Sequence, residues 1–361
     1  MIFILFIAFC LTTFGHLAPF PDLKSPIILS HRGSRFLNPE NSKPAFHSAL
    51  DMGTDVIETD IRITKDKKLI IFHDKTVERT TNGTGLVSEK TLKEMKNLNI
   101  GYQFTPDNGK TFPYRRKNLK VMELNEFFEE FFPLNTYINI EIKDDSIEAA
   151  EILWNVLKNH KLEYIQKHLN IISSYYPVIS KLRKLSNDTI PTSASELEGT
   201  VFIISSKFYL NVFINTLKKM KTNLFQIPCI AAGGSINLKS KKIIEDLHKN
   251  GRKVHYWVIN DKKTMKEVLL LGADGLITDR TDLAMEVWEE LGLKKRKKTT
   301  KEFYLPIDNF VEIYTCTTFL CILIENFISF LLISVLIFSS FLAFVYFLCW
   351  KCQENQKIKK E

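Results

Sequence analysis

Short apolar runs rich in β-branched residues alternate with helical patterns from residue 27 to residue 291 of this chain. This repeated order of strand and helix is typical of a parallel sheet whose strands are joined by crossover helices. Repetition over such a length favours an α/β fold of the TIM (β/α)8 barrel type over a doubly wound sheet. No glycine-rich phosphate loop follows the first run, which argues against a nucleotide-binding fold. The predicted strands are Ile27–His31, Asp55–Ile61, Leu69–His73, Tyr137–Ile142, Asn170–Ser174, Ile190–Ser193, Phe225–Ala231, Val254–Ile259 and Gly275–Thr278.

Helical patterns fill most of the gaps between these strands. The predicted helices are Ser42–Met52, Leu124–Phe132, Ile147–Leu157, Leu238–Asn250, Lys262–Leu271 and Asp282–Leu291.

One connection departs from the repeated order. The second and third strands are joined only by Thr64–Lys68, too few residues for a parallel crossover, so we predict an antiparallel hairpin. Pairing Thr64 with Leu69 would place His73 across from Asp60 and return the histidine to the level of the carboxylates.

Two further segments interrupt the pattern. Lys75–Val121 is rich in turn residues and has little periodicity, which predicts an insertion over the barrel mouth. Val201–Met220 is apolar with lysines gathered at one end. The segment is predicted to be either a core helix or a lipid-facing surface at the barrel mouth.

Composition narrows the classes of function. The net charge of +8 comes from lysines scattered over 361 residues, without a helix-turn-helix, a finger or an aromatic-basic platform, so we predict no nucleic-acid binding. Of the six cysteines only Cys229 lies in the central region, which excludes a disulfide framework there. No feature indicates an obligate protein partner.

Both ends of the chain are apolar. The first 18 residues are predicted to be a signal peptide or an N-terminal anchor, and Phe327–Trp350 is an uncharged run long enough for a transmembrane helix. Lysines after this run favour a cytoplasmic tail and a lumenal catalytic domain. The terminal KIKKE resembles a dilysine retrieval signal, so we expect a single-pass protein of the endoplasmic reticulum membrane. The predicted division is a barrel over 26–292, a basic interfacial linker over 293–326, the span over 327–350 and a lysine-rich tail over 351–361.

Carboxylates stand at two strand ends with the same spacing. Glu58 and Asp60 are two residues apart, so their side chains face the same side of the strand, and Glu141 and Lys143 repeat this spacing. Three carboxylates that converge at the catalytic end of a barrel would repel one another without a cation. Oxygen ligands suit a hard divalent ion, Mg²⁺ or Ca²⁺.

Two histidines end apolar runs. His31 is followed by Arg32, and His73 is followed by Asp74. A histidine pair can divide the work of general base and general acid. Arg32 offers a bidentate fork for a phosphate and Lys143 a point charge, so the set indicates phosphoryl-ester chemistry.

The motifs HRG…PEN, E-T-D, H-D, E-I-K, W-V-I-N and G-L-I-T-D occur in this order from Ser30 to Asp279. They resemble the motifs of the glycerophosphodiester phosphodiesterase family, and most closely those of its membrane-anchored, lysophospholipase D-like branch. The resemblance implies a TIM barrel of the phospholipase C-like phosphodiesterase type with a divalent cation. It also implies the following roles: Glu58, Asp60 and Glu141 as metal ligands; His31 and His73 as the acid/base pair, with His73 alternatively a metal ligand; Arg32 and Lys143 on the phosphate; Glu40 and Asn41 supporting the first-strand loop; and Trp257 lining the substrate channel.

The predicted function is therefore a metal-dependent phosphodiesterase acting at a membrane. It would release the headgroup alcohol from a glycerophosphodiester or a lysophospholipid and leave glycerol-3-phosphate or lysophosphatidic acid. A catalytically silent lipid-binding module is the alternative of a different class, and the complete set of carboxylates and histidines argues against it. A phospholipase C-type reaction at the other ester bond remains open. Direct attack by water and formation of a cyclic phosphate are open as well.

Overall fold

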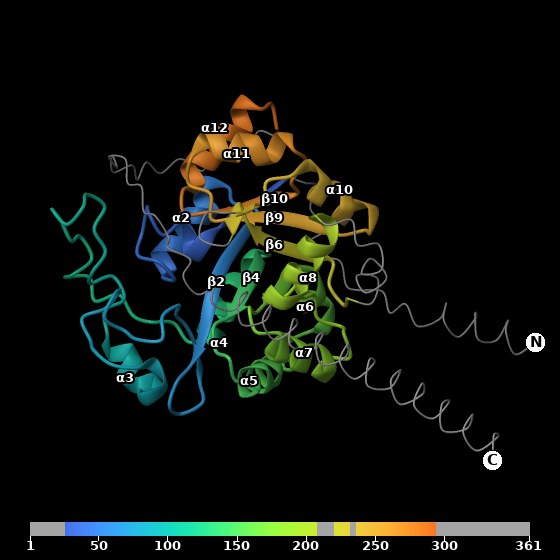
Figure 1. The fold of residues 1–361 in the computed structure, drawn as a ribbon. Helices are drawn as coiled ribbons and strands as arrows, with labels where there is room; N and C mark the ends of the chain where they lie inside the picture. The colour runs from blue at the N-terminus through green and yellow to red at the C-terminus, as the bar shows by residue number, and fades with distance from the viewer. Residues whose placement is uncertain (1–25, 208–219, 232–235, 294–361) are drawn as a thin grey trace, which may run out of the picture. The chain divides into compact units, whose positions relative to one another are not determined.

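The computed structural model describes residues 26–207, 220–231 and 236–293, drawn in colour in Figure 1. Residues 26–207, 220–229 and 238–293 form one compact unit. A separate antiparallel hairpin consists of β7 (Ile230–Ala231) and β8 (Ile236–Asn237). Four predicted parts lie outside the described residues: the N-terminal segment, the linker, the membrane span and the tail. Residues 208–219 of the apolar segment 201–220 lie outside them as well. Among the helices that are described, none has the length and apolarity to cross a membrane.

Seven parallel strands form the centre of the compact unit. They lie side by side in the order β5-β4-β2-β1-β10-β9-β6. Their bounds are β1 (Ile27–Ser30), β2 (Val56–Ile63), β4 (Tyr137–Ile142), β5 (Leu169–Ile172), β6 (Leu224–Pro228), β9 (Lys253–Trp257) and β10 (Gly275–Thr278). The predicted parallel α/β sheet is confirmed, with several strand bounds as expected to within two residues.

The sixth predicted strand is irregular. Residues 190–193 form no regular strand, but parallel bridges join Ile171 of β5 to Thr192 and Ser193 to Leu224 of β6. The segment therefore connects the two edge strands of the sheet. Pro191 explains its irregularity, because proline has no N–H to donate to a sheet ladder.

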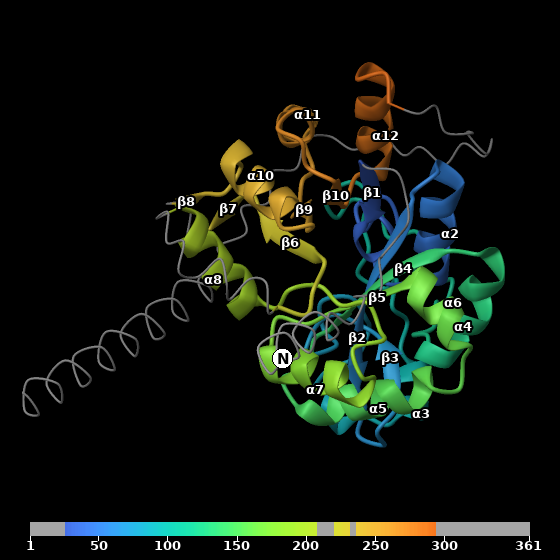
Figure 2. The same ribbon diagram turned by 90° about the vertical axis from the view of Figure 1, so that its right-hand side faces the viewer.

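Helices lie around the outside of these strands (Figures 1 and 2). All six predicted helices are present. The structure contains four more that the sequence pattern does not predict: α3, α6, α7 and α8. The bounds are α2 (Lys43–Met52), α3 (Leu92–Asn97), α4 (Leu124–Phe131), α5 (Ile147–Leu157), α6 (Leu162–His168), α7 (Tyr176–Leu185), α8 (Glu196–Lys207), α10 (Lys241–Lys249), α11 (Lys262–Leu270) and α12 (Thr281–Glu290). Short 3₁₀ turns are η1 (His31–Gly33), η2 (Val87–Glu89) and η3 (Phe132–Leu134).

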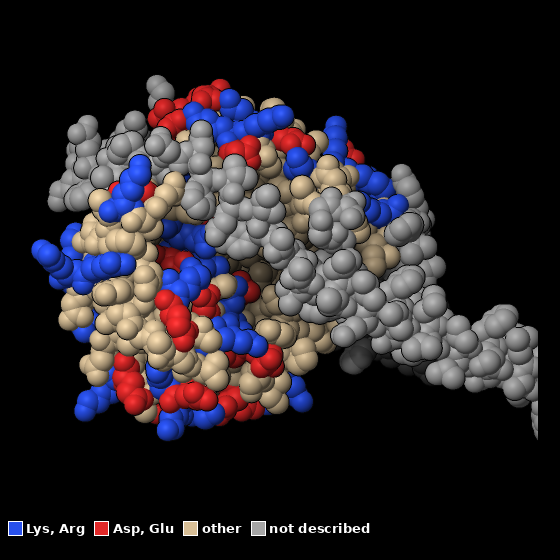
Figure 3. All heavy atoms as spheres, turned by 60° about the vertical axis from the view of Figure 1, so that its left-hand side comes forward, with Lys and Arg blue, Asp and Glu red and all other residues tan. Residues whose placement is uncertain are grey.

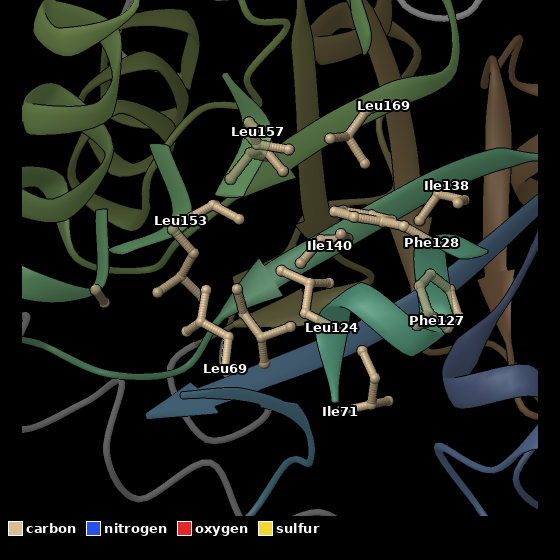
Figure 4. Close-up of a cluster of buried hydrophobic side chains, with 14 of the residues drawn as sticks. Leu69, Ile71, Leu124, Phe127, Phe128, Ile138, Ile140, Leu153, Leu157 and Leu169 are labelled. Carbon is tan, nitrogen blue, oxygen red and sulfur yellow. The ribbon is translucent and has the colours of Figure 1, made fainter. Parts of the chain in front are cut away.

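The alternation of side chains along β2 and β4 separates the core from the site. Ile57 and Ile61 face the helices and are fully buried. Glu58 and Asp60 point to the opposite face, because successive side chains of a strand alternate. Figure 4 shows the helix-facing core around Ile138 and Ile140 of β4. Its other labelled members are Leu69, Ile71, Leu124, Phe127, Phe128, Leu153, Leu157 and Leu169.

The predicted hairpin is confirmed, but its register is shifted by one residue. β3 (Leu69–Ile71) pairs antiparallel with β2 so that Ile63, not Thr64, lies opposite Leu69. The Thr64 N–H donates to the Lys68 carbonyl at 2.9 Å, and this pair closes a tighter loop than expected. His73 is therefore not across from Asp60; it lies beyond the end of β3 and reaches the carboxylates from the following loop.

The predicted insertion, residues 75–121, is a packed structure with its own core. It contains η2 and α3, and Met95 and Val121 are nearly inaccessible to solvent. These residues pack with Ile70 and Phe72 from the β2–β3 hairpin in a cluster separate from the helix-facing core. The insertion is thereby fixed to the hairpin that carries His73.

Candidate active site at the carboxyl ends of the strands

The predicted site residues gather at one edge of the sheet. Parallel strands present their carboxyl ends on the same side. Several of these residues follow a strand, Glu141 lies near the end of β4, and Glu58 and Asp60 lie in the part of β2 that pairs with β4. Trp257, the last residue of β9, is 41% exposed at this end. Figure 3 shows acidic and basic side chains side by side around a hollow on the face that it presents. The other residues that the strand ends bring together are His31, Arg32, Glu58, Asp60, His73, Glu141 and Lys143.

Three carboxylates form the centre of the site. Glu58, Asp60 and Glu141 each offer an oxygen atom, and these atoms all lie within 4.8 Å of one another. The strand register sets this convergence, because Asp60 of β2 lies directly beside Glu141 of β4. Burial and the neighbouring Asp60 raise the pKa of Glu58 well above its ordinary value. The three groups are therefore costly to hold together without positive charge.

Two cationic side chains, Lys143 and Arg32, lie next to the three carboxylates. Lys143 Nζ lies 2.9 Å from Glu141 Oε2 and 3.4 Å from Asp60 Oδ1, and Arg32 Nε lies 3.1 Å from Asp60 Oδ2. Burial alone would raise the pKa of Asp60, but the two cations outweigh it and hold that pKa far below its usual range.

The donor set fits a divalent cation. Asp60 Oδ1 is buried and accepts no hydrogen bond within the described part of the chain. An unsatisfied buried carboxylate oxygen is costly, and a bound ion would satisfy it. All three residues supply oxygen, the donor that Mg²⁺ and Ca²⁺ prefer. The triad is thus able to bind such an ion.

A tight turn after β1 positions Arg32, the first candidate for binding the phosphate. Arg32 has a φ of 49° and Gly33 a φ of 77°. A Cβ at Gly33 would lie 2.8 Å from Ala45, so only glycine fits this close approach. The Arg32 backbone N–H donates to Glu58 Oε2 at 2.9 Å, which ties the turn to the carboxylates.

Each histidine is held by an aspartate. His31 Nδ1 lies 2.6 Å from Asp279 Oδ1, and His73 Nδ1 lies 2.5 Å from Asp74 Oδ1. Both contacts engage Nδ1 and leave Nε2 as the nitrogen for chemistry. Burial lowers the pKa of both imidazoles, while the aspartates act in the opposite direction.

Glu40 is linked through arginine side chains to both aspartates that hold the histidines. Its carboxylate accepts from Arg32 Nη1 at 2.9 Å and from both terminal nitrogens of Arg79 at 2.7 Å. Arg79 in turn donates to Asp74, and Arg35 links Glu40 to Asp279. These cations hold the pKa of Glu40 well below its ordinary value despite burial.

Asn41 contacts the carboxylate centre directly. Its Nδ2 donates to Asp60 Oδ2 at 2.9 Å, and its Oδ1 accepts from Thr59 Oγ1 at 2.8 Å. Glu40 and Asn41 therefore contact Arg32 and Asp60, and their role in supporting the first-strand loop stays a prediction.

Several residues of the site were not predicted. Asp279 follows the apolar run of β10 just as His31 follows β1, so the strand-end pattern contained a signal for it. Arg79 and Arg62 carried none, because each acts on residues that only the folded chain brings near. Asn260 also belongs here, since its Nδ2 donates to Asp279 Oδ2 at 2.8 Å.

Arg62 ties two strand ends together beneath the site. Its buried guanidinium donates to the His73 carbonyl at 2.6 Å and to the Lys143 carbonyl at 3.2 Å. It also donates to Asp144 Oδ1 at 3.2 Å, and Asp144 Oδ2 accepts the Ile63 N–H at 2.9 Å. One side chain therefore sets the distance between the backbones that carry His73 and Lys143.

Known proteins match this chain over the described unit. Residues 31–283 match the model of the glycerophosphoryl diester phosphodiesterase family. A glycerophosphodiester phosphodiesterase of Caldanaerobacter subterraneus subsp. tengcongensis is 31% identical over 253 residues, covering 70% of this chain and 93% of its own. The human lysophospholipase D GDPD1 is 26% identical over 274 residues, covering 70% and 82%.

Solved structures share the fold. A phosphodiesterase from Oleispira antarctica, in complex with the product sn-glycerol-3-phosphate, matches with a TM-score of 0.59 and 22% identity. The match covers 73% of this chain and 97% of that protein. At this identity the likeness concerns the fold alone.

Proposed function

The chain belongs to the glycerophosphoryl diester phosphodiesterase family, and we propose that it uses a divalent cation to remove headgroup alcohols from lysophospholipids and glycerophosphodiesters. It is a phosphoric diester hydrolase. The observation that carries the finer proposal is the convergence of Glu58, Asp60 and Glu141 beside two cationic side chains and two aspartate-held histidines.

The cation, Mg²⁺ or Ca²⁺, would be held by the three carboxylates, with His73 Nε2 as a further candidate ligand. When bound, it supplies positive charge that stabilises the negative charge developing on the phosphate. Arg32 and Lys143 lie against the same carboxylates, so they are placed to hold the phosphate oxygens next to that charge.

The two histidines divide the proton transfers. One Nε2 accepts the proton of the attacking hydroxyl as its oxygen bonds to phosphorus, and the other gives a proton to the alcohol oxygen as its bond to phosphorus breaks. Asp279 and Asp74 fix the rings for these roles. The arrangement serves attack by water and attack by a neighbouring glycerol hydroxyl equally.

The finer features of the protein are part of the same proposal. The strand order and the bridges of residues 190–193 support a TIM (β/α)8 barrel. The uncharged run Phe327–Trp350 supports a membrane anchor. Trp257 is placed at the strand ends, where it would line the substrate channel.

The proposal is tested with detergent-solubilised full-length protein, lysophosphatidylcholine and glycerophosphocholine. We expect choline release that EDTA abolishes and that Mg²⁺ or Ca²⁺ restores. Release of phosphocholine instead would indicate the phospholipase C-type reaction, and no hydrolysis of either substrate would favour the silent lipid-binding module. Replacing His47, a half-buried histidine of α2 that pairs with Glu130, with Ala controls for the loss of an imidazole.

Replacing Arg62 with Gln is expected to lower kcat about 10-fold to 100-fold, with a small change in KM. Gln cannot bridge the His73 and Lys143 carbonyls, so the general acid/base and the phosphate ligand lose their fixed separation. Steady-state kinetics measure the effect, and a melting curve reports the fold.

A conservative exchange separates positioning from folding for this residue. Arg62→Lys keeps the charge and one donor, so it should recover part of kcat. Equal kcat in wild type and Arg62→Gln would contradict the positioning role.

A further inference from the structure

The loop of residues 101–120, which we call the basic loop, carries an unbalanced charge. Its sequence has five cations and one acid, Asp107. The cations Lys110, Arg115, Arg116, Lys117 and Lys120 are all exposed. Asp107 is occupied within the loop, since it accepts hydrogen bonds from the hydroxyls of Thr105 and Thr111 at 2.9 and 2.7 Å.

This concentration differs from the lysine surplus elsewhere. Several surface lysines elsewhere face acids, as Lys43 does with Glu130 and Lys242 with Asp246. Within the described ranges, no ion pair joins any of the five loop cations to an acid. The positive charge of this surface is therefore left for a partner.

The basic loop is ordered without that partner. Asn99 donates to the Tyr114 and Arg115 carbonyls at 3.0 and 3.1 Å, and its Oδ1 accepts from the Gly101 and Leu119 N–H groups. The Arg115 guanidinium lies 3.5 Å from the centre of the Phe112 ring. A surface already held in shape loses little conformational entropy on binding.

The basic loop lies against the catalytic turn. The Tyr114 hydroxyl donates to Asn38 Oδ1 at 3.0 Å, and Asn38 lies in the loop that runs from His31 to Asn41. A Cβ on Gly101 would lie 3.3 Å from Pro39, which shows how closely the two loops pack. In Figure 1 the teal insertion extends away from the sheet at this side.

We propose that the basic loop is a docking surface for anionic lipid bilayers and holds the active-site mouth at the membrane. The proposal rests on the lysophospholipid substrate of the proposed function, which resides in such a bilayer. Polybasic segments bind anionic membrane surfaces, with each lysine or arginine adding to the attraction. The half-buried rings of Phe104 and Phe112 supply apolar area beside the cations, as interfacial segments do.

The test uses the full-length protein reconstituted in nanodiscs and does not require activity. Hydrogen exchange of peptides covering 101–120 is compared between phosphatidylcholine discs and discs with phosphatidylserine. We expect slower exchange of the basic loop in the anionic discs, and a triple variant of Arg116, Lys117 and Lys120, each to Glu, should lose this protection. The matched control changes Lys158, Lys161 and Lys167 to Glu, exposed residues near the opposite, amino ends of the strands.

A kinetic arm adds the consequence for substrate access. Adding phosphatidylserine to about 30% of the lipid should lower the apparent KM of the wild type for lysophosphatidylcholine about 10-fold. The apparent KM of the triple basic-loop variant should not change. Hydrolysis of water-soluble glycerophosphocholine should be equal in both proteins.

Three results would overturn the proposal: equal exchange in both discs, protection that survives the triple variant, or protection by an RNA oligonucleotide without protection by lipid. Failure of the enzyme to hydrolyse either substrate would instead contradict the proposed function and leave the exchange result intact.

Discussion

Replacing Asp60 with Asn is expected to lower kcat/KM by about 10³-fold or more, because a bound cation contributes several kcal/mol and each 1.4 kcal/mol is tenfold in rate. Asp60 is fully buried and is the residue on which the site converges. It shares the triad with Glu58 and Glu141 and also faces Arg32 and Lys143. Asn keeps the shape of the side chain but removes the negative charge that attracts both the metal ion and the side chains of Arg32 and Lys143.

The effect of Asp60→Asn on cation binding should be measurable without an activity assay. Isothermal titration of the EDTA-treated protein with Mg²⁺ or Ca²⁺ should show binding to wild type and loss of affinity in Asp60→Asn. Glu130→Gln is the matched control, since Glu130 is a half-buried carboxylate that pairs with Lys43 and His47. Unchanged ion affinity in Asp60→Asn would show that the triad is not the cation site.

The carboxylate centre could be predicted because local rules suffice for it. A period of two places Glu58 and Asp60 on one face of β2, and parallel strands bring Glu141 to the same edge. The bounds of β4 and β10 followed from apolar runs that end in charged or turn residues. No knowledge of distant contacts was needed for any of these.

The missed features depend on long-range contacts or on local turn geometry. The His31–Asp279 pair joins residues 248 apart in sequence, and Arg62 meets Lys143 across 81 residues. The hairpin register depended on the Thr64–Lys68 hydrogen bond, which residue types alone did not reveal. α7 was missed although Pro177 stands in its first turn, where proline is favoured. The sequence pattern predicts no helix for its apolar residues Val178, Ile179 and Leu182, which lie between two predicted strands.

The other large effect is expected at the His31–Asp279 pair. His31→Ala should lower kcat/KM by about 10³-fold, the usual contribution of a general acid or base, and Asp279→Asn by about 10²-fold. Asp279 Oδ1 binds His31 Nδ1, so the carboxylate keeps Nε2 free and aligned. Asn in its place removes the charge and puts an NH2 donor where one of the two acceptor oxygens of Asp279 stands, although both oxygens accept in the wild type.

The pH profile distinguishes this role from a loss of structure. Burial and Arg32 lower the pKa of His31, and Asp279 raises it, so removing the aspartate charge should lower that pKa further. A base works only when neutral, and activity falls as the pH drops below its pKa. The limb of the kcat/KM profile that His31 sets, the acid limb if it is the base and the basic limb if it is the acid, should therefore move to lower pH in Asp279→Asn while the plateau falls. A structural defect would lower the rate at every pH without moving the limb.

The double variant His31→Ala/Asp279→Asn completes the argument. If Asp279 acts only through His31, its loss costs nothing further once the imidazole is gone, and the double variant should match His31→Ala. Asp74→Asn gives the corresponding comparison at His73, whose Nδ1 is held in the same way. Additive losses for His31 and Asp279 would mean that Asp279 serves the site through Arg35 or Asn260 instead, two other side chains that it contacts.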